Sequence, residues 1–428
     1  MTTILKRAVW LLLPIIFTLW SSIAPATDLR IVVLIVVWLT GLFYAVPALT
    51  APVYWLRMSP SLLWILWLTG LSAMILIWLL RFQPAVGIPL SITEQLWLVG
   101  NTIGLLLLPF AHYNRSEYIP AMRWRAGLLT TLTTILIIII GLELGLRFAY
   151  VMSDNFQFSK MHQNWHRLYW NPINADGYRD YEAPPPDDQR THILVLGDSL
   201  VTGYGVNHID DTFPHILDAQ LGADYTVNIA AQPGWGISNA LDGAQVYPIE
   251  PDVVVLSHYI NDIAEGIAAE AYDRPFPQIR VEPTEQQRWW TDRFYIANFW
   301  YYRVYLYTAH DSVSLYNDWI YDAYGNGEVW SNYQLELQSI LDWTEEIDAP
   351  LVVVVWSNLL DIESSRRLTD PIVTFYSERD VPVVDMATLL ADLPASQRTA
   401  NIFDAHPSVR SHRIAGEALV DVINQVAP

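Results

Sequence analysis

Five long apolar runs occupy most of the first 150 residues, at roughly 8–25, 31–50, 61–80, 94–111 and 127–149. A helix needs about 20 apolar residues to cross the hydrocarbon of a bilayer. These runs are apolar on all sides, whereas a helix in a soluble core keeps a polar stripe. We therefore expect residues 1–150 to form a transmembrane region of about five helices that acts as an anchor.

The basic residues of this region predict its orientation. Short cytoplasmic loops are rich in Lys and Arg, and the loops on one side contain Lys6, Arg7, Arg57, Arg115, Arg123 and Arg125. An odd number of crossings then places residues 151–428 outside the cytoplasm, on a multi-pass protein of the cell membrane with the bilayer as partner. The first run also reads as a secretory signal, because Ala24-Pro25-Ala26 follows it; its removal would leave the tail on the same side.

Charge separates the two halves of the chain. Residues 1–150 have four acidic and nine basic side chains, and the rest of the chain has 40 acidic and 15 basic ones. So acidic a segment repels phosphate backbones, which excludes nucleic acid as a partner. The absence of cysteine excludes disulfides, thiolate zinc sites and a thiol nucleophile.

After an irregular lead-in at 151–190, short apolar β-branched runs alternate with helical patterns. The runs are 192–196, 225–229, 252–256, 351–355 and 381–384, and the helical patterns include 213–221, 334–347 and 412–423. This alternation predicts an α/β domain with a parallel sheet between two layers of helices. An aromatic-rich insertion at about 265–332 interrupts it. The insertion either packs over the sheet, forms a wall that stacks on sugars, or rests on the membrane.

Ser199 is the candidate nucleophile. It lies in Leu196-Gly197-Asp198-Ser199, where a predicted buried strand ends, and ligands of parallel sheets bind beyond the carboxyl ends of the strands. We expect Asp198 to fix this turn by local hydrogen bonds. A serine hydroxyl needs a base, and His406, just before the last helical pattern, is the candidate. Asp404, two residues earlier, can orient the imidazole ring.

Two further strand ends supply candidate donors for an oxyanion. Gly234 follows the second predicted strand and can offer its backbone N–H, and Asn261 follows the third and can offer its side-chain amide. The N–H of Ser199 completes a predicted oxyanion hole. His162 and His166 are spaced like metal ligands on a helix, but no third ligand flanks them, so a structural role is expected.

Residues 191–428 resemble the SGNH (GDSL) hydrolases. Ser199, Gly234, Asn261 and His406 match the four blocks of that family in order, and Asn174-Ala175-Asp176-Gly177-Tyr178-Arg179 is similar to a segment that precedes the first block in exported bacterial members. The resemblance implies a flavodoxin-like three-layer α/β/α domain. It also implies acyl transfer through an acyl-serine, with no metal or cofactor.

Two positions depart from the family pattern. Tyr259 occupies the position of a glycine in the third block, and its side chain can narrow the pocket or shift the loop of Asn261. In the last block the acid usually stands three residues before the histidine, whereas Asp404 stands two before His406. Either the turn is shorter by one residue, or Asp404 does not orient His406 and the enzyme uses a dyad.

Three functions follow from these observations. The first is an extracytoplasmic serine ester hydrolase that removes acyl groups, such as O-acetyl, from glycans or lipids of the cell envelope. The second is an O-acyltransferase that uses the same acyl-serine to modify an exported polysaccharide. The third is a catalytically inactive surface-binding module, which only Tyr259 and the displaced Asp404 favour.

Overall fold

The computed structural model describes residues 135–427 except 137, 156–158, 186, 266–271, 275–276, 278–281 and 309. The contacts divide the chain after Gly141, and Leu142–Pro428 forms the second compact unit. The apolar runs at 8–25, 31–50, 61–80 and 94–111, and the start of the run at 127–149, lie outside the described residues. Within the described residues, no helix combines the length and the hydropathy needed to span a bilayer.

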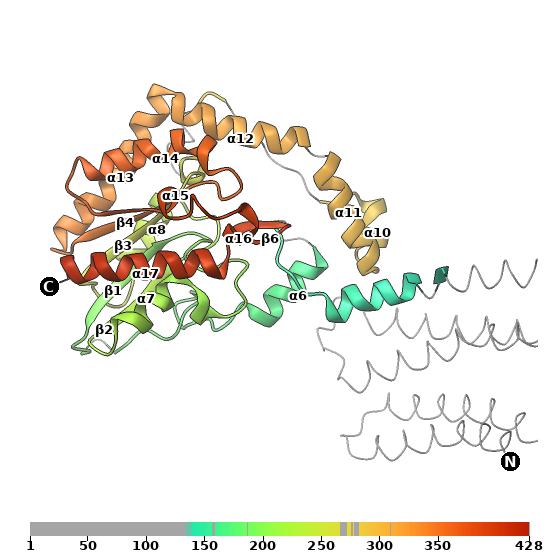
Figure 1. Ribbon diagram of the computed structural model, residues 1–428, viewed down its shortest axis with the longest axis horizontal. Helices are drawn as coiled ribbons and strands as arrows, with labels where there is room; N and C mark the ends of the chain where they lie inside the picture. Colours follow the sequence, from blue (N-terminus) through green and yellow to red (C-terminus); the bar gives the residue numbers. More distant parts are fainter. Residues whose placement is uncertain are drawn as a thin grey trace, which may run out of the picture. The chain divides into compact units, whose positions relative to one another are not determined.

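A five-stranded parallel sheet forms the centre of the second unit (Figure 1), with the strand order β2-β1-β3-β4-β5. This is the order of flavodoxin-like folds. All five runs predicted as strands are confirmed, with small shifts at their ends: β1 Thr191–Gly197, β2 Tyr225–Ala231, β3 Val253–Tyr259, β4 Leu351–Trp356 and β5 Val383–Asp385.

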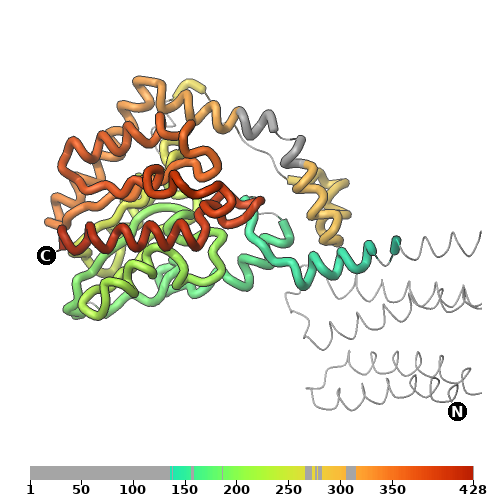
Figure 2. The backbone as a smooth tube through the Cα atoms, viewed as in Figure 1, coloured from blue at the N-terminus to red at the C-terminus, as the bar shows by residue number. Residues whose placement is uncertain are grey.

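Helices cover both faces of this sheet, as the parallel order requires. On one face α7 (Phe213–Leu221) packs against α17 (Val409–Val426). On the other, α8 (Ile237–Gln245) packs against α13 (Gly327–Glu346), and α14 (Ile362–Ser377) lies over β4 and β5. Figures 1 and 2 show the three layers. The predicted α/β/α sandwich is therefore confirmed.

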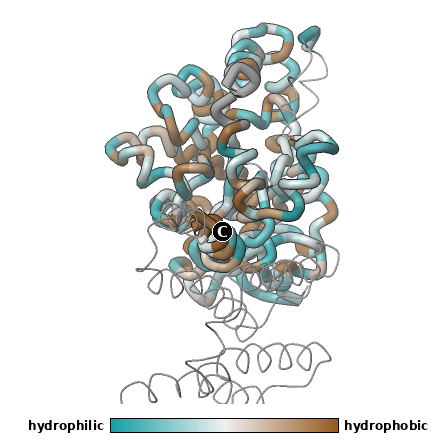
Figure 3. Tube along the Cα trace, turned by 90° about the vertical axis from the view of Figure 1, so that its right-hand side faces the viewer, coloured by the Kyte–Doolittle hydropathy of each residue, from teal (hydrophilic) through white to brown (hydrophobic). Residues whose placement is uncertain are grey.

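The strands are apolar because both faces of the sheet are buried. In β1 and β3 nearly every residue is buried, and the central residues of β4 are fully inaccessible. Along the surrounding helices, hydrophobic and hydrophilic residues alternate (Figure 3), as expected for helices with one face on a core. The remaining short helices of the core domain are η4 (Ile209–Asp211), α9 (Asp262–Glu265), α15 (Met386–Leu389) and α16 (Ala395–Arg398).

The aromatic-rich insertion contains α10 (Glu285–Thr291), α11 (Tyr295–Thr308) and α12 (His310–Gly325). Helix α12 joins the core through Trp319 and Ala323, which are fully buried. Helix α11 instead contacts α6 (Lys160–Tyr169) and η3 (Gly145–Ala149), two elements of the preceding segment. Of the three helices of the insertion, α12 therefore packs onto the domain core, whereas α10 and α11 lie away from the sheet (Figure 1).

Candidate active site

Ser199 follows β1 at a turn that only glycine permits. Gly197, the last residue of β1, has φ +151°, and a Cβ there would lie 2.7 Å from a Val201 methyl carbon and 2.9 Å from the Ser257 carbonyl oxygen. The Asp198 carboxylate accepts the Leu200 N–H at 2.9 Å, which agrees with its predicted role in the turn. Ser199 is left partly exposed, as a nucleophile has to be.

His406 and Asp404 lie on the same short strand, β7 (Asp404–Pro407), which pairs antiparallel with β6 (Thr399–Asn401). Side chains two residues apart on a strand point to the same face. The Asp404 carboxylate accordingly contacts His406 Nδ1 at 2.5 Å, and His406 Nε2 lies 3.0 Å from Ser199 Oγ. The spacing of two therefore reflects a strand and not a shortened turn, and the structure brings the three predicted residues together.

The electrostatics of the Ser199, His406 and Asp404 side chains suit His406 to act as a base. Burial lowers the pKa of His406, but the charge and hydrogen bond of Asp404 outweigh burial and raise it above the ordinary value. Burial raises the pKa of Asp404, yet the neighbouring His406 and its hydrogen bonds bring it below the ordinary value. Asp404 thus remains ionised and holds the Nδ1 proton of the ring, which leaves Nε2 to accept the proton of Ser199.

Gly234 and Asn261 follow β2 and β3, at the same end of the sheet as Ser199. Gly234 is exposed and has φ +82°, and no Cβ contact restricts that position. Among the described residues, neither its backbone N–H nor that of Ser199 has a hydrogen-bond acceptor. These two amides are therefore available to a ligand.

Asn261 is engaged by the protein itself. Its amide nitrogen donates to Glu265 Oε1 at 2.8 Å, and its side chain also hydrogen-bonds the Tyr316 hydroxyl of α12. An N–H of Asn261 reaches a substrate oxygen only if one of these contacts gives way. Burial, aided by the charge of Asp198, raises the pKa of Glu265 to about 8, so at neutral pH this partner is largely the uncharged acid.

Tyr259 causes no distortion of the third block. It is the last residue of β3, pairs with Trp356 of β4, and its N–H donates to Asp262 Oδ2 at 3.0 Å. Its φ is not in the left-handed region, so the backbone here does not need the freedom of glycine.

A sequence model of the GDSL-like lipase/acylhydrolase family matches residues 195–414. This span runs from β1 through Ser199 to His406 and into α17, and it covers about half of the chain. The chain belongs to the GDSL-like lipase/acylhydrolase family. It is accordingly an ester-hydrolysing enzyme.

Several solved structures are also similar to the chain. They include the psychrotrophic esterase EstA of Pseudoalteromonas sp. (13% identity, 55% of this chain and 97% of that chain covered, TM-score 0.33). A carbohydrate acetylesterase family member of Sinorhizobium meliloti is 15% identical, with 55% of this chain and 99% of that chain covered and a TM-score of 0.32. A lipase/acylhydrolase of Enterococcus faecalis is 14% identical, with 55% of this chain and 95% of that chain covered and a TM-score of 0.33. The family assignment rests on the sequence model alone. No curated protein matches the chain.

In this GDSL-family site a buried arginine of the lead-in fixes the loop after the nucleophile. The Arg179 guanidinium donates to the carbonyl oxygens of Thr202, Gly203 and Val206 at 2.8–2.9 Å, and also to that of Tyr169. Burial lowers the pKa of Arg179 to about 10, so the group remains charged. The sequence showed the segment that contains Arg179, but the role of its side chain depends on contacts between segments.

Tyr204 is a neighbour of the triad that the sequence reasoning missed. The centroid of its ring lies 4.5 Å from that of the His406 ring, and the Tyr204 ring also stacks on that of His162, with 5.1 Å between centroids. The Tyr204 hydroxyl lies 2.8 Å from His162 Nε2, and His162 Nδ1 accepts the Asp154 N–H. The structural role predicted for His162 agrees with these contacts.

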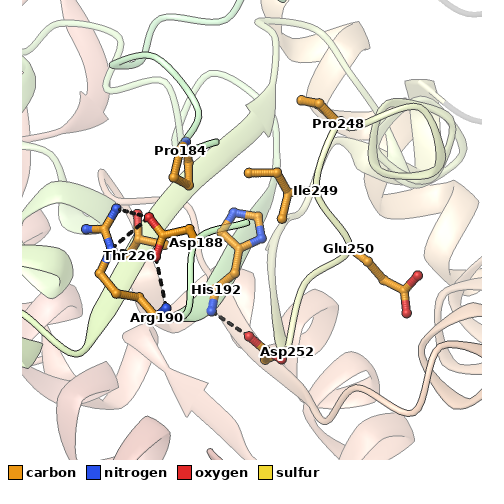
Figure 4. A pocket seen from close by; sticks show the side chains of 9 residues that line it. All are labelled: Pro184, Asp188, Arg190, His192, Thr226, Pro248, Ile249, Glu250 and Asp252. Carbon is orange, nitrogen blue, oxygen red and sulfur yellow. Dashed lines mark hydrogen bonds and ion pairs between the residues drawn. The ribbon is translucent and has the colours of Figure 1, made fainter. Parts of the chain in front are cut away.

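A hollow of about 270 Å³ lies at the other end of the sheet (Figure 4). It is lined by His192 at the start of β1, Thr226 near the start of β2 and Asp252 just before β3. Because Ser199 follows the opposite end of β1, this hollow is separate from the triad.

Proposed function

We propose that this family member is a serine ester hydrolase in which Ser199, His406 and Asp404 form the catalytic triad. The continuous hydrogen-bonded chain from Ser199 Oγ to the buried Asp404 carboxylate carries the proposal. The support for an inactive binding module is gone, because Tyr259 sits in ordinary strand geometry and Asp404 contacts His406.

The chemistry follows from this geometry. His406 Nε2 takes the proton of Ser199 as Oγ bonds to the acyl carbon, and the carbonyl electrons move to the oxygen. The backbone N–H groups of Ser199 and Gly234, joined by Asn261, stabilise that oxyanion. As the bond to the leaving alcohol breaks, His406 returns the proton to it. Water then attacks the acyl-serine with His406 again as base, and releases the acid.

We also propose that the domain is held at the outer face of the cell membrane and acts on acyl esters, O-acetyl esters among them, of envelope glycans or lipids. The apolar runs of the first 150 residues and the basic residues between them support this location. The strongly acidic composition of the remaining chain agrees with a neutral or uncharged substrate rather than a polyanion.

The test compares the full-length protein in detergent with its Ser199→Ala variant. The wild type should hydrolyse p-nitrophenyl acetate and take up a fluorophosphonate on Ser199, and the variant should do neither. The matched control is Ser364→Ala, an exposed serine of α14, which should behave like wild type. Unchanged hydrolysis by a folded Ser199→Ala variant would refute the proposal. Acyl transfer to an added glycan in excess of free acid would favour the transferase.

A further inference from the structure

Three tryptophans of α10 and α11 are exposed to solvent to an unusual degree. The exposed fractions are 49% for Trp289, 56% for Trp290 and 58% for Trp300. Val304, one turn after Trp300 on the same face of α11, is 53% exposed. Exposed clusters of large apolar side chains mark surfaces that another phase or molecule covers.

The two helices are bound to the end of the last apolar run, at Glu143 and Arg147. The Glu143 carboxylate accepts the N–H groups of Tyr295 and Ile296 at 2.9 and 2.8 Å, and so caps the first turn of α11. Arg147 pairs with Glu143 at 2.8 Å and donates to the Arg293 carbonyl oxygen at 3.0 Å. Figure 1 shows α10 and α11 beside this segment.

These contacts of Glu143 and Arg147 with residues 293–296, called the clamp below, indicate where a bilayer surface would lie. Glu143 lies in the last two turns of the apolar run at 127–149 and caps a helix of the enzyme domain, so a helix formed by this run would leave the hydrocarbon close to Glu143. The helices bound to Glu143 would then lie close to the level at which the run leaves the hydrocarbon.

We propose that the exposed tryptophans of α10 and α11 lie in the headgroup region of the bilayer that anchors the chain. The proposal rests on the membrane attachment proposed above. Tryptophan rings concentrate at this interface because they are apolar with one polar N–H. Basic side chains accompany them: the Arg293 guanidinium lies 5.0 Å from the Trp289 ring centroid, and Arg288 is exposed on α10, where it pairs with Glu282. Basic side chains at this level are attracted to lipid phosphates.

The contact would give the domain a second support besides the polypeptide link. A single link leaves the domain free to swivel, whereas a link plus an aromatic surface fixes its height and tilt. A bilayer explains the surface better than a second copy of the chain, because the surface continues directly from a clamp at the end of an apolar run.

The absence of cysteine from the chain allows a direct test. Trp290→Cys and Trp300→Cys variants of the full-length protein are labelled with an environment-sensitive fluorophore and reconstituted in phosphatidylcholine–phosphatidylglycerol vesicles. The control is Leu335→Cys on α13, where the side chain is 69% exposed. Ester hydrolysis by each variant reports that it is folded.

Spin-labelled lipid should quench both labels several-fold more than the control, and iodide should quench them several-fold less. If the labels were as accessible to iodide as the control while the chain resisted carbonate extraction, the contact of α10 and α11 with the bilayer would be refuted and the membrane attachment would stand. Labels shielded from both quenchers would indicate a protein partner and would also refute the contact with the bilayer. A chain extracted by carbonate would refute the membrane attachment itself.

Discussion

Glu265→Gln should remove the alkaline limb of the pH–rate profile. Glutamine keeps an oxygen that can accept the Asn261 amide N–H but cannot ionise. In the wild type, burial and then the charge of Asp198 raise the pKa of Glu265 to about 8. The charge on Glu265, the partner of Asn261, therefore appears between pH 7 and 9, where Asp404, whose pKa is lowered, is already ionised.

The size of the expected fall in rate follows from the geometry, because Glu265 and the oxyanion would share the amide group of Asn261. Glu265 Oε1 is 2.8 Å from Asn261 Nδ2, and an oxyanion bound to the same nitrogen would lie about 5 Å from Oε1. Two unit charges at that distance repel by roughly 3 kcal/mol at an effective dielectric constant of about 20. This is about a hundredfold in rate for the ionised form. With a pKa of about 8, roughly a tenth of the enzyme is active at pH 9, so kcat/KM should fall about tenfold from its neutral value.

The assay is kcat/KM for p-nitrophenyl acetate from pH 5 to 9.5, corrected for spontaneous hydrolysis. The acid limb should reflect His406, which has to be neutral and whose pKa is raised, so this limb should lie above pH 6.5 in both proteins. Asp198, Asp262 and Tyr316 also face Glu265. The charge of Glu265 helps to raise the pKa of Asp262 and of Tyr316, so both pKa values should be lower in the variant. Glu346→Gln, an exposed position at the end of α13, is the control. An alkaline limb that persists in a folded Glu265→Gln protein would refute the reasoning.

Three further predictions concern the scaffold of the triad. Asp404→Asn should lower kcat roughly 10³–10⁴-fold with little change in KM, because the amide favours the wrong tautomer; an equal rate would indicate a dyad. Gly205→Ala should lower Tm and activity, since its Cβ would lie 2.7 Å from that of Ala400. Gly222→Ala has the same φ of +86° but no neighbour within 4 Å, so it should cost only about 1 kcal/mol. Arg179→Met should destabilise the fold by several kcal/mol in denaturant titrations, as buried carbonyls lose a charged donor; an unchanged midpoint would contradict this.

Much of the fold could be predicted because local pattern and burial agree. Runs such as 192–196 are β-branched and apolar, which fits only a strand covered on both faces. The serine, glycine and asparagine of the candidate site could be placed because each follows such a run, and parallel strands end at one edge. His406 was identified because it lies next to the start of the last helix, α17.

The rest depends on contacts between distant segments. The spacing of Asp404 and His406 by itself predicts a turn, whereas pairing with β6 makes a strand with both side chains on one face. The Glu265 contact was missed, since its burial depends on α12, some 50 residues later in the chain. The insertion was treated as one body, yet α12 packs on the core while α10 and α11 are bound to Glu143.

The lead-in has a consequence for proteolytic release of the enzyme. Asn401 Nδ2 donates to the Ser153 carbonyl oxygen, and the Ala405 N–H donates to Asn155 Oδ1, so residues 153–155 brace the hairpin that carries His406. Cleavage just after Asn155, which is exposed, would separate this brace from the rest of the enzyme domain and leave the base without its support. Proteolysis at that point would then lower the activity of the released domain.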